Sequence, residues 1–408
     1  MSITLPLNRP FPEYVWRWAS ADPTESLNQP AVYFGCLKVL VDNEGKNASS
    51  EEVNKQLEII EKDLPFELKK HTNRPVNLVR STVRNIFRNS GQYWRMSGLL
   101  TSTTPIRTSD VAKAYVANKI NKFDYASYLI KTLTLPNPYI IEDQEVIDTW
   151  KANGLEIKPL EELFKIFLEL SSYDENSCFI SDRELLTVII PMIGNKYLTK
   201  DIAKALIEFR NKKILGVNWY SSKEARWAKE FLIFLKNYEI VDEIKKGVFF
   251  ADESSLNIMS TLLGTPLPVT STSPKVTPTL SQTFFQKRER KTVSVLSRPQ
   301  QQKFRKELLT VQPTCILSGV KSPNVLQACH IIPVKNHGSD DINNGIILRS
   351  DLHILYDIGD IKIMEDGSIK LSDQLAADPY YSKNLPKKIS IPSHVNIDHI
   401  RIRNKYDM

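Results

Sequence analysis

A stretch of low sequence complexity between Thr265 and Thr283 most constrains how this chain can fold. It reads TPLPVTSTSPKVTPTLSQT, and almost none of its residues suit a hydrophobic core. Pro, Ser and Thr dominate it, which is typical of an extended, semi-flexible linker. The basic run KRERK follows shortly after it. We therefore expect a linker over residues 263–296 and separately folded parts on either side of it.

Length and composition agree with several soluble domains. The chain has 408 residues, of which 41% are hydrophobic and 25% charged, whereas a single core usually stops growing at about 250–300 residues. No apolar run reaches the roughly 18 residues of a membrane-spanning helix, and no secretory signal is recognisable. The four cysteines are scattered, as in proteins of a reducing compartment. We expect a protein of the prokaryotic cytoplasm that binds no membrane.

Glycine usage argues against a nucleotide-binding enzyme. The chain has only 14 glycines, and neither a GxGxxG nor a GxxxxGK motif occurs. Those motifs let the backbone approach and bind phosphate groups. No nucleotide cofactor is therefore expected.

Basic residues are concentrated in residues 69–109, which contain eight Lys and Arg but no Asp or Glu. Apolar spacing predicts a helix over residues 76–90, on which Arg80, Arg84 and Arg88 form a stripe at i, i+4 and i+8. Such a stripe can be simply a solvated face. The absence of acids favours contact with phosphates, because such contacts require uncompensated positive charge.

A second helix is predicted to begin near Thr108 or Ser109, after a short connection. A basic helix, a short connection and another helix are typical of helix-turn-helix and winged-helix modules that bind DNA. We therefore expect residues 1–145 to form a helical, winged-helix-like DNA-binding domain. The candidate DNA-binding residues are Arg80, Arg84, Arg88, Arg95 and Arg107.

Residues 146–262 are also predicted to be mainly helical. Two segments, Ser181–Glu184 and Ser221–Glu224, have the spacing of a capping box and should begin helices. Residues 239–250 should form a hairpin after the second of these helices. Short helices closed by a hairpin fit a second winged-helix domain, and they fit a helical spacer equally well.

Histidine is concentrated in the last part of the chain, where five of the six histidines lie at or after His330. His330 ends a predicted strand, and an Asn-Gly pair introduces a second strand. Residues 350–359 then predict a short helix with Ser350 as its N-cap. His353 and Asp357 are four residues apart and should share one face of that helix.

The order of strand with His, Asn-Gly strand and helix with His resembles the HNH endonuclease motif, the ββα-metal fold. The resemblance covers residues 297–408, about a quarter of the chain, and includes a hairpin turning at Asp366 and Gly367. It implies an α+β multidomain protein in which this nuclease domain is C-terminal. Further matching positions are Arg298, Gln301, Phe304, Arg305, the CILSG segment from Cys315, and His330–Pro333.

By its position in the motif, His330 is the expected general base. A neutral imidazole, with an ordinary pKa of about 6.5, suits proton abstraction from water near neutral pH. Asn344, just before Gly345, occupies the asparagine position of the motif, although Asn343 stays an alternative. Its amide would either bind the metal ion or fix the loop beside His330, and the sequence does not separate these two roles.

His353 and Asp357 are the expected metal ligands. Many relatives have Asp or His just before the catalytic histidine, whereas this chain has Cys329. Thiolates suit softer ions than Mg²⁺, so Cys329 is expected to pack in the strand while Asp357 supplies the anionic ligand. We expect Mg²⁺, with Mn²⁺ as the alternative. Since the chain contains no CxxC pair, no structural zinc is expected.

Together these features predict a metal-dependent endonuclease that hydrolyses phosphodiester bonds of double-stranded DNA. A nuclease domain joined to a large DNA-binding region resembles type II or modification-dependent restriction enzymes, or another phage-defence enzyme. Because one HNH site cuts one strand, a homodimer is expected. The alternatives are a nicking or homing-type HNH endonuclease, and a DNA-binding protein whose HNH domain is silent.

Overall fold

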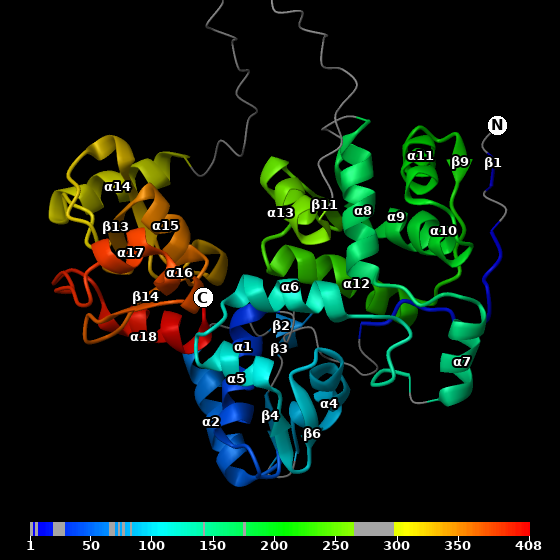
Figure 1. The fold of residues 1–408 in the computed structure, drawn as a ribbon, viewed down its shortest axis with the longest axis horizontal. Helices are drawn as coiled ribbons and strands as arrows, with labels where there is room; N and C mark the ends of the chain where they lie inside the picture. The colour runs from blue at the N-terminus through cyan, green and yellow to red at the C-terminus, as the bar shows by residue number, and fades with distance from the viewer. Residues whose placement is uncertain are drawn as a thin grey trace, which may run out of the picture. The chain divides into compact units, whose positions relative to one another are not determined.

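The computed structural model describes residues 3–4, 7–18, 29–64, 70–71, 74–75, 78–81, 84–141, 143–173, 177–264 and 298–408. They divide into two compact units (Figure 1). The first unit comprises the described residues within Met1–Glu61, Lys69–Lys113 and Phe123–Ser273, and the second those within Lys62–Leu68, Ala114–Lys122 and Pro274–Met408. Nearly all of the expected linker lies outside the described residues. None of the described helices is long and apolar enough to span a membrane.

The first part of the first unit packs helices against short hairpins. Tyr33 from one helix stacks on Trp94 from another, with ring centroids 4.4 Å apart, and both rings are buried. The elements, in chain order, are β1 (Ile3–Thr4), α1 (Pro30–Asp42), α2 (Glu51–Asp63), β2 (Lys70–His71), β3 (Arg74–Pro75), β4 (Val79–Ser81), β5 (Arg84–Asn85), α4 (Phe87–Met96), β6 (Leu100–Thr103), β7 (Ile106–Thr108), α5 (Asp110–Val116) and α6 (Lys122–Thr132).

The prediction of one helix over residues 76–90 is wrong. Strands β4 and β5 pair antiparallel, and helix α4 begins only at Phe87. The segment is rich in β-branched residues, which favour strands over helices. The buried Asn85 amide also donates to Ala48 and accepts from the Phe87 backbone N–H, which fixes the chain just before α4. The helical stripe is therefore wrong too, since its members lie in β4 (Arg80), β5 (Arg84) and α4 (Arg88).

The second part of the first unit contains helices and a three-stranded antiparallel sheet in the order β10–β11–β8. The elements are α7 (Gln144–Ala152), α8 (Pro159–Ser171), β8 (Phe179–Ser181), α9 (Asp182–Glu184), the π-helical turn η3 (Leu185–Ile189), α10 (Ile190–Gly194), α11 (Thr199–Arg210), β9 (Ile214–Leu215), α12 (Ser222–Asn237), β10 (Asp242–Lys245), β11 (Val248–Phe250) and α13 (Glu253–Leu263).

Local predictions for this second part are confirmed. Both capping boxes are present: Ser181 caps α9 and Ser221 caps α12, each with the reciprocal glutamate contact. The hairpin expected within residues 239–250 is the β10–β11 pair. A prediction for the first part is confirmed as well: the helix expected to begin near Thr108 or Ser109 is α5, and the Ser109 hydroxyl accepts from the backbone N–H of Ala112 in its first turn.

The second unit contains a two-stranded sheet between helices. Strand β12 (Leu326–His330) pairs antiparallel with β13 (Gly345–Arg349), with His330 opposite Gly345. The remaining elements are α14 (Arg298–Val311), η4 (Pro323–Val325), η5 (Val334–Asn336), η6 (Ile342–Asn344), α15 (Ser350–Asp357), β14 (Ile361–Ile363), β15 (Ile369–Leu371), α16 (Asp373–Ala377), α17 (Pro379–Asn384) and α18 (Ile397–Tyr406).

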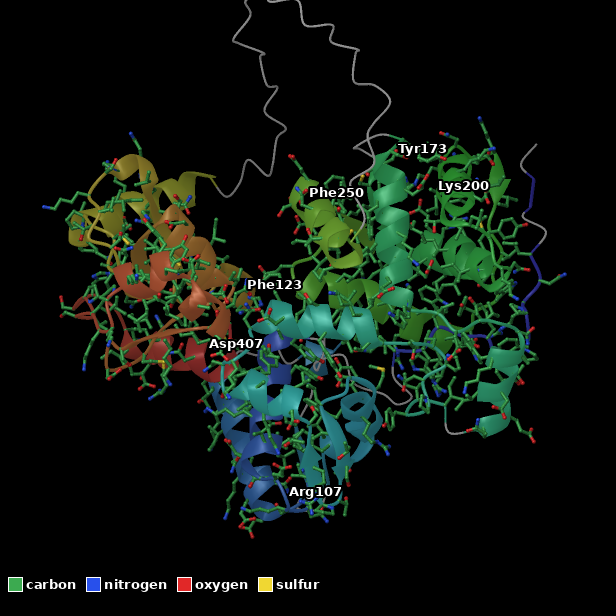
Figure 2. The ribbon with its side chains drawn as sticks, in the orientation of Figure 1. Arg107, Phe123, Tyr173, Lys200, Phe250 and Asp407 are labelled. Carbon is green, nitrogen blue, oxygen red and sulfur yellow. The ribbon has the colours of Figure 1, made fainter. Side chains whose placement is uncertain are left out.

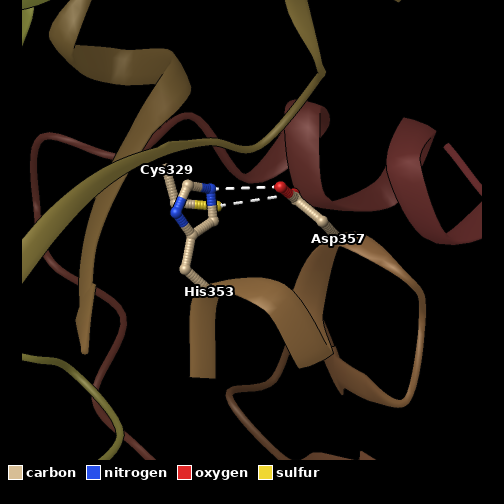
Figure 3. Close-up of side chains that lie close together, drawn as sticks. All are labelled: Cys329, His353 and Asp357. Carbon is tan, nitrogen blue, oxygen red and sulfur yellow. Dashed lines mark hydrogen bonds and ion pairs between the residues drawn. The ribbon is translucent and has the colours of Figure 1, made fainter. Parts of the chain in front are cut away.

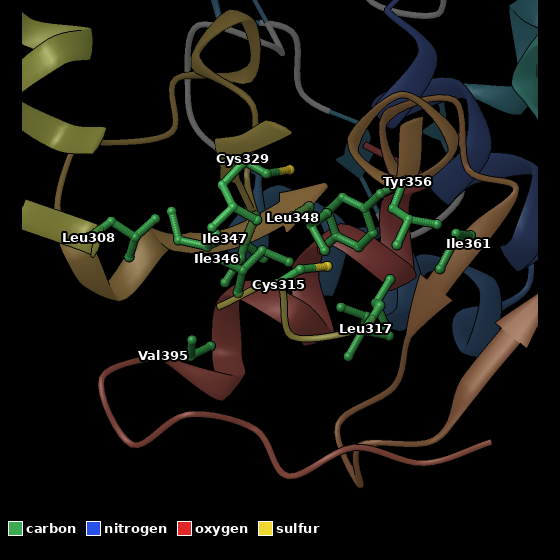
Figure 4. Close-up of a cluster of buried hydrophobic side chains, with 14 of the residues drawn as sticks. Leu308, Cys315, Leu317, Cys329, Ile346, Ile347, Leu348, Tyr356, Ile361 and Val395 are labelled. Atoms are coloured by element: carbon green, nitrogen blue, oxygen red, sulfur yellow. The ribbon is translucent and has the colours of Figure 1, made fainter. Parts of the chain in front are cut away.

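A compact apolar core fixes this sheet against α14, α15 and α18 (Figure 4). It includes Leu308, Cys315, Leu348 and Tyr356, all at most 2% exposed. The hairpin β14–β15 turns at Asp366 and Gly367 as predicted, and Gly367 has a φ of 82°. The core therefore holds β12 and α15, which carry the candidate histidines His330 and His353, in one rigid framework.

One detail of α15 differs from the prediction. Its N-cap is Arg349 rather than Ser350, and no side chain caps the helix. The Arg349 guanidinium instead contacts both carboxylate oxygens of Asp351 in the first turn, at 2.6 and 2.8 Å. An acidic residue in the first turn is favourable at the positive end of the helix dipole, so Asp351 replaces the expected serine cap.

Candidate active site and metal site

His330 lies at the end of β12, where two side chains determine its orientation. Its Nε2 lies 2.9 Å from Asp340 Oδ1, and the Phe304 ring stacks on the imidazole with centroids 4.3 Å apart and planes 10° apart. The His330 side chain is 13% exposed. The predicted general base is therefore partly accessible and held on two sides.

Asn344 is buried beneath the loop that joins β12 to β13, with 1% of its surface exposed. Its Oδ1 accepts from the Ile332 backbone N–H, and its Nδ2 donates to the carbonyls of Ile332 and Ser339 at 3.0 and 2.8 Å. Both ends of the amide are thus used within the loop. This arrangement matches the loop-fixing role considered for Asn344, and it does not bring the amide to the pair formed by His353 and Asp357.

His353 and Asp357 face each other across one turn of α15, as their spacing predicts. His353 Nε2 lies 3.1 Å from Asp357 Oδ2 (Figure 3). On the other side of the ring, Nδ1 lies 2.7 Å from Gln327 Oε1. Because an amide oxygen only accepts, Nδ1 carries a proton, and the Nε2 lone pair of a neutral ring faces the carboxylate. A proton or a metal cation is needed between those two atoms.

The surroundings keep Asp357 ionised. Burial alone would raise the pKa of this carboxyl. When His353 is protonated, its hydrogen bond and charge, together with the charge of Arg403, outweigh burial, and the pKa of Asp357 lies below its ordinary value. Arg403 is buried in α18, with Nη2 lying 3.7 Å from Asp357 Oδ1. The hydrogen bonds of the Arg403 guanidinium go to the backbone carbonyls of Ile331 and Tyr356. Asp357 is therefore an anion at neutral pH.

Cys329 completes a three-residue cluster, because its Sγ, a His353 ring nitrogen and an Asp357 oxygen all lie within 4.8 Å of one another (Figure 3). The thiol is fully buried. Burial and the neighbouring Asp357 charge raise the pKa of Cys329 well above its ordinary value. The thiolate is the form that ligates metals, so in the absence of a cation Cys329 is a buried thiol beside His353 and Asp357.

The spacing of His353 and Asp357 suits a divalent cation. Ligands about 2.1 Å from an octahedral ion are about 3 Å apart along one edge, and His353 Nε2 and Asp357 Oδ2 have that separation. The pair offers one imidazole and one carboxylate, and leaves the other coordination positions for water and phosphate oxygens. Gln327 orients the imidazole from behind, as groups around metal-binding histidines commonly do.

An open groove of about 690 Å³ lies beside His330. Its lining includes Phe304 and Asp340, the two residues that contact the His330 ring, together with Lys303, Asp341 and Asn343. The groove thus borders the two side chains that hold the His330 ring, which is itself 13% exposed.

Cys315 and the three other histidines of this unit have the following surroundings. Cys315 is buried in the core. His394 contacts the Gly345 carbonyl and His399 the Asn343 carbonyl, both at 3.2 Å, so the C-terminal segment packs on the loop before β13. His337 lies in the polar loop with a φ of 63°. Asn343 contributes backbone contacts here, whereas the side chain of Asn344 holds the loop.

The structure describes the side chains of two candidate DNA-binding arginines, Arg95 and Arg107. Arg107 is exposed on β7 (Figure 2). The Arg95 guanidinium, near the end of α4, lies 5.7 Å from the centre of the Tyr139 ring. The side chains of Arg80, Arg84 and Arg88 lie outside the described residues.

Sequence reasoning missed three residues of the site: Asp340, Gln327 and Arg403. Asp340 stands in an acidic pair within a polar loop, and such pairs usually indicate only a solvated loop. Gln327 lies 26 residues before His353 in the chain, and no sequence pattern connects the two. Arg403 follows His353 by 50 residues, and only the packing of α18 brings it to Asp357.

The comparisons with known proteins agree with this geometry. No curated protein matches the chain. A family model described as HNH endonuclease matches residues 315–364. The match spans β12, β13 and α15, and it includes His330, Asn344, His353 and Asp357. Residues 315–364 of the second unit are therefore a domain of the HNH endonuclease family.

Proposed function

We propose that this protein is a metal-dependent DNA endonuclease with His330 as its general base. The observation that carries the proposal is that one ββα arrangement holds a partly accessible imidazole at the end of its strand and an ionised carboxylate–imidazole pair on its helix. Cys329, the neighbour of His330 in the chain, lies against that pair, which supports assigning both groups to one site. The HNH family match supports nuclease chemistry on the same residues.

In the proposed reaction, His330 takes a proton from a water molecule while the water oxygen forms a bond to phosphorus. The P–O3′ bond breaks, and the 3′-oxygen leaves with the electron pair and takes a proton from solvent. Asn344 keeps the loop beside His330 in place. A divalent ion held by His353 and Asp357, Mg²⁺ or Mn²⁺, would neutralise charge on the phosphate and the leaving oxygen.

The first unit is proposed to bind double-stranded DNA. In its second part, α8 is followed by β8, then by α9, η3, α10 and α11, and later by the β10–β11 hairpin, with β8 joining that hairpin in one sheet. This order of helices, strand and hairpin supports a winged-helix-like module in residues 146–262. In the first part, α4 followed by the β6–β7 hairpin supports a similar module in residues 1–145. Phosphate contacts by Arg95 and Arg107 agree with this role.

The biological role we propose is restriction or phage defence, with the protein acting as a homodimer in the prokaryotic cytoplasm. One HNH site cuts one strand, so two copies would be needed for a double-strand break. A nicking or homing-type enzyme would use the same residues. A silent HNH domain is disfavoured because His330, Asn344 and His353 are all present.

The test is cleavage of modified and unmodified plasmid and phage DNA, with Mg²⁺ or Mn²⁺, by the wild type and by His330→Ala. Discrete fragments with the wild type alone are expected. Nicked products alone would instead support the nicking enzyme. Equal binding by both proteins without any metal-dependent cleavage would contradict nuclease activity and support the silent domain.

A further inference from the structure

We propose that Asp340 is a positioning residue that holds His330 in the tautomer required of the base. The proposal rests on the proposed function, because it assigns a role to a neighbour of the same histidine. It specifies which ring nitrogen, Nδ1, receives the proton from water. Neither the family resemblance nor the sequence pattern singles out Asp340 for such a role.

The contact between the two side chains determines the tautomer. His330 Nε2 lies 2.9 Å from Asp340 Oδ1. Since an ionised carboxylate only accepts, the proton of the neutral ring must be on Nε2. Among the described residues, no group hydrogen-bonds His330 Nδ1, so its lone pair is available to a substrate water.

Phe304 restrains the ring in the remaining direction. Its side chain, on α14, stacks almost parallel to the imidazole. A Cβ added to Gly345, opposite His330 in the sheet, would lie 2.6 Å from the Phe304 ring. The glycine therefore leaves room for Phe304 to approach His330. Phe304 fixes the plane of the imidazole, and Asp340 fixes which edge of it faces the loop.

Asp340 is itself held by the loop that Asn344 organises. Asn344 Nδ2 donates to the carbonyl of Ser339, the residue just before Asp340. The buried amide thus positions the loop, and the loop positions the carboxylate. This gives Asn344 an indirect effect on His330 that does not require the amide to touch a metal ion.

The same hydrogen bond stabilises the product of proton transfer. When Nδ1 takes the proton from water, the ring becomes an imidazolium whose Nε2–H still donates to Asp340. The carboxylate then faces a full positive charge, and charge-assisted hydrogen bonds are the stronger ones. Asp340 keeps no proton in this step. Its removal should slow the chemical step more than it weakens DNA binding.

The neighbouring acid provides a matched control. Asp341 lines the same groove as Asp340, yet no hydrogen bond joins its side chain to His330 in the described residues. Asp340→Ala and Asp341→Ala remove the same charge and the same acceptor oxygens from the same groove. A difference between the two variants therefore reports on the contact with His330 and not on the net charge.

The experiment combines two readouts on the full-length protein. The first is the ¹⁵N spectrum of histidine-labelled protein without metal or DNA, in which His330→Ala identifies the His330 signals. We expect the Nε2–H tautomer in the wild type and in Asp341→Ala, and a mixed or reversed tautomer in Asp340→Ala. The second is cleavage with Mg²⁺, where Asp340→Ala should lower kcat about 10- to 100-fold and change KM for DNA less than about threefold. Asp340→Glu, which keeps the acceptor, should recover part of kcat.

Two results would overturn the proposal. One is an unchanged His330 tautomer in Asp340→Ala, and the other is equal kcat values for Asp340→Ala and Asp341→Ala. Failure of the proposed function is distinguishable, because the wild type and His330→Ala would then cleave DNA equally, or neither would cleave it. The tautomer is measured without DNA, so that readout still decides the proposal.

Discussion

The two units differ in where they place their tryptophans and histidines. All six tryptophans lie in the first unit, at or before Trp227, whereas five of the six histidines lie in the second. Trp16, Trp18, Trp94 and Trp150 are fully buried, which is the use of large apolar rings in a packed core. The histidines instead meet carboxylates, carbonyls and an amide. The first unit is thus organised by packing, whereas the second also carries side chains that are able to exchange protons or bind a cation.

Ion pairs show the same contrast. In the first unit, Arg210 contacts the buried Glu184 of a capping box and the backbone around β8, so the pair fixes local structure. In the second unit, His353 and Asp357 form a pair that a proton or a cation must complete. A difference of this kind predicts that substitutions in the second unit change reactivity, while those in the first change DNA affinity or stability.

The largest effect is expected for the metal pair. Asp357→Asn and His353→Ala should each reduce metal-supported cleavage by about 10³-fold, because the ion contributes several kcal/mol to the transition state. DNA affinity measured without metal should remain within about twofold. The readouts are cleavage rates and Mn²⁺ titrations. Asp373→Asn, an exposed carboxylate at the start of α16, is the control. If Asp357→Asn cleaved DNA at the wild-type rate, Asp357 would not be a metal ligand.

A smaller effect on metal affinity is expected for Gln327, which contacts the proposed metal ligand His353. Gln327→Leu removes the acceptor of the His353 Nδ1–H bond and frees the ring to change tautomer. The affinity for Mn²⁺ should fall about 10- to 100-fold, as is usual for groups that orient metal-binding histidines. Calorimetric titration measures it. Gln327→Glu keeps an acceptor at this position and should bind Mn²⁺ more tightly than Gln327→Leu does. Equal affinities for the wild type and Gln327→Leu would contradict this role.

The candidate site was largely predictable because its signals are local. A strand ending in His330, an Asn-Gly pair and a helix with His353 and Asp357 lie within 28 residues of each other, and each has its own short-range pattern. Spacing of four residues places His353 and Asp357 on one helix face whatever surrounds the helix. The partners Asp340, Gln327 and Arg403 were not predictable, since tertiary packing alone brings them to the histidines and to Asp357.

The first unit shows where such local reasoning fails. Residues 76–90 have apolar spacing compatible with a helix, yet β4 and β5 form there. The deciding contacts are non-local: Asn85 is buried against Ala48 and Asn54, about 30 residues earlier in the chain. By contrast, the capping boxes at Ser181 and Ser221 were predictable because both partners lie three residues apart.

The third-largest effect is expected on DNA affinity, when Arg95 and Arg107 are replaced. Arg95→Ala combined with Arg107→Ala should weaken binding to all DNA sequences by about 3- to 10-fold and lower the slope of log affinity against log salt by about two. The double variant Lys158→Ala and Lys165→Ala removes the same charge from α8 and its N-cap, where both lysines pair with glutamates. Its slope should change less. Equal slopes in the two double variants would mean that Arg95 and Arg107 are solvated surface residues that make no phosphate contacts.

The smallest effect, Ser221→Ala, tests whether the two units act separately. Ser221 Oγ accepts from the Glu224 backbone N–H at the start of α12, and loss of such a cap costs about 1 kcal/mol. Urea unfolding followed by tryptophan fluorescence reports on the first unit alone, because every tryptophan lies there. The fluorescence midpoint should fall, while Mn²⁺ affinity and the His330 tautomer stay at their wild-type values. Ser222→Ala, one residue later and exposed, is the control. If Ser221→Ala weakened Mn²⁺ binding, the stability of the first unit and the chemistry of the second would be coupled, and the comparison between them would fail.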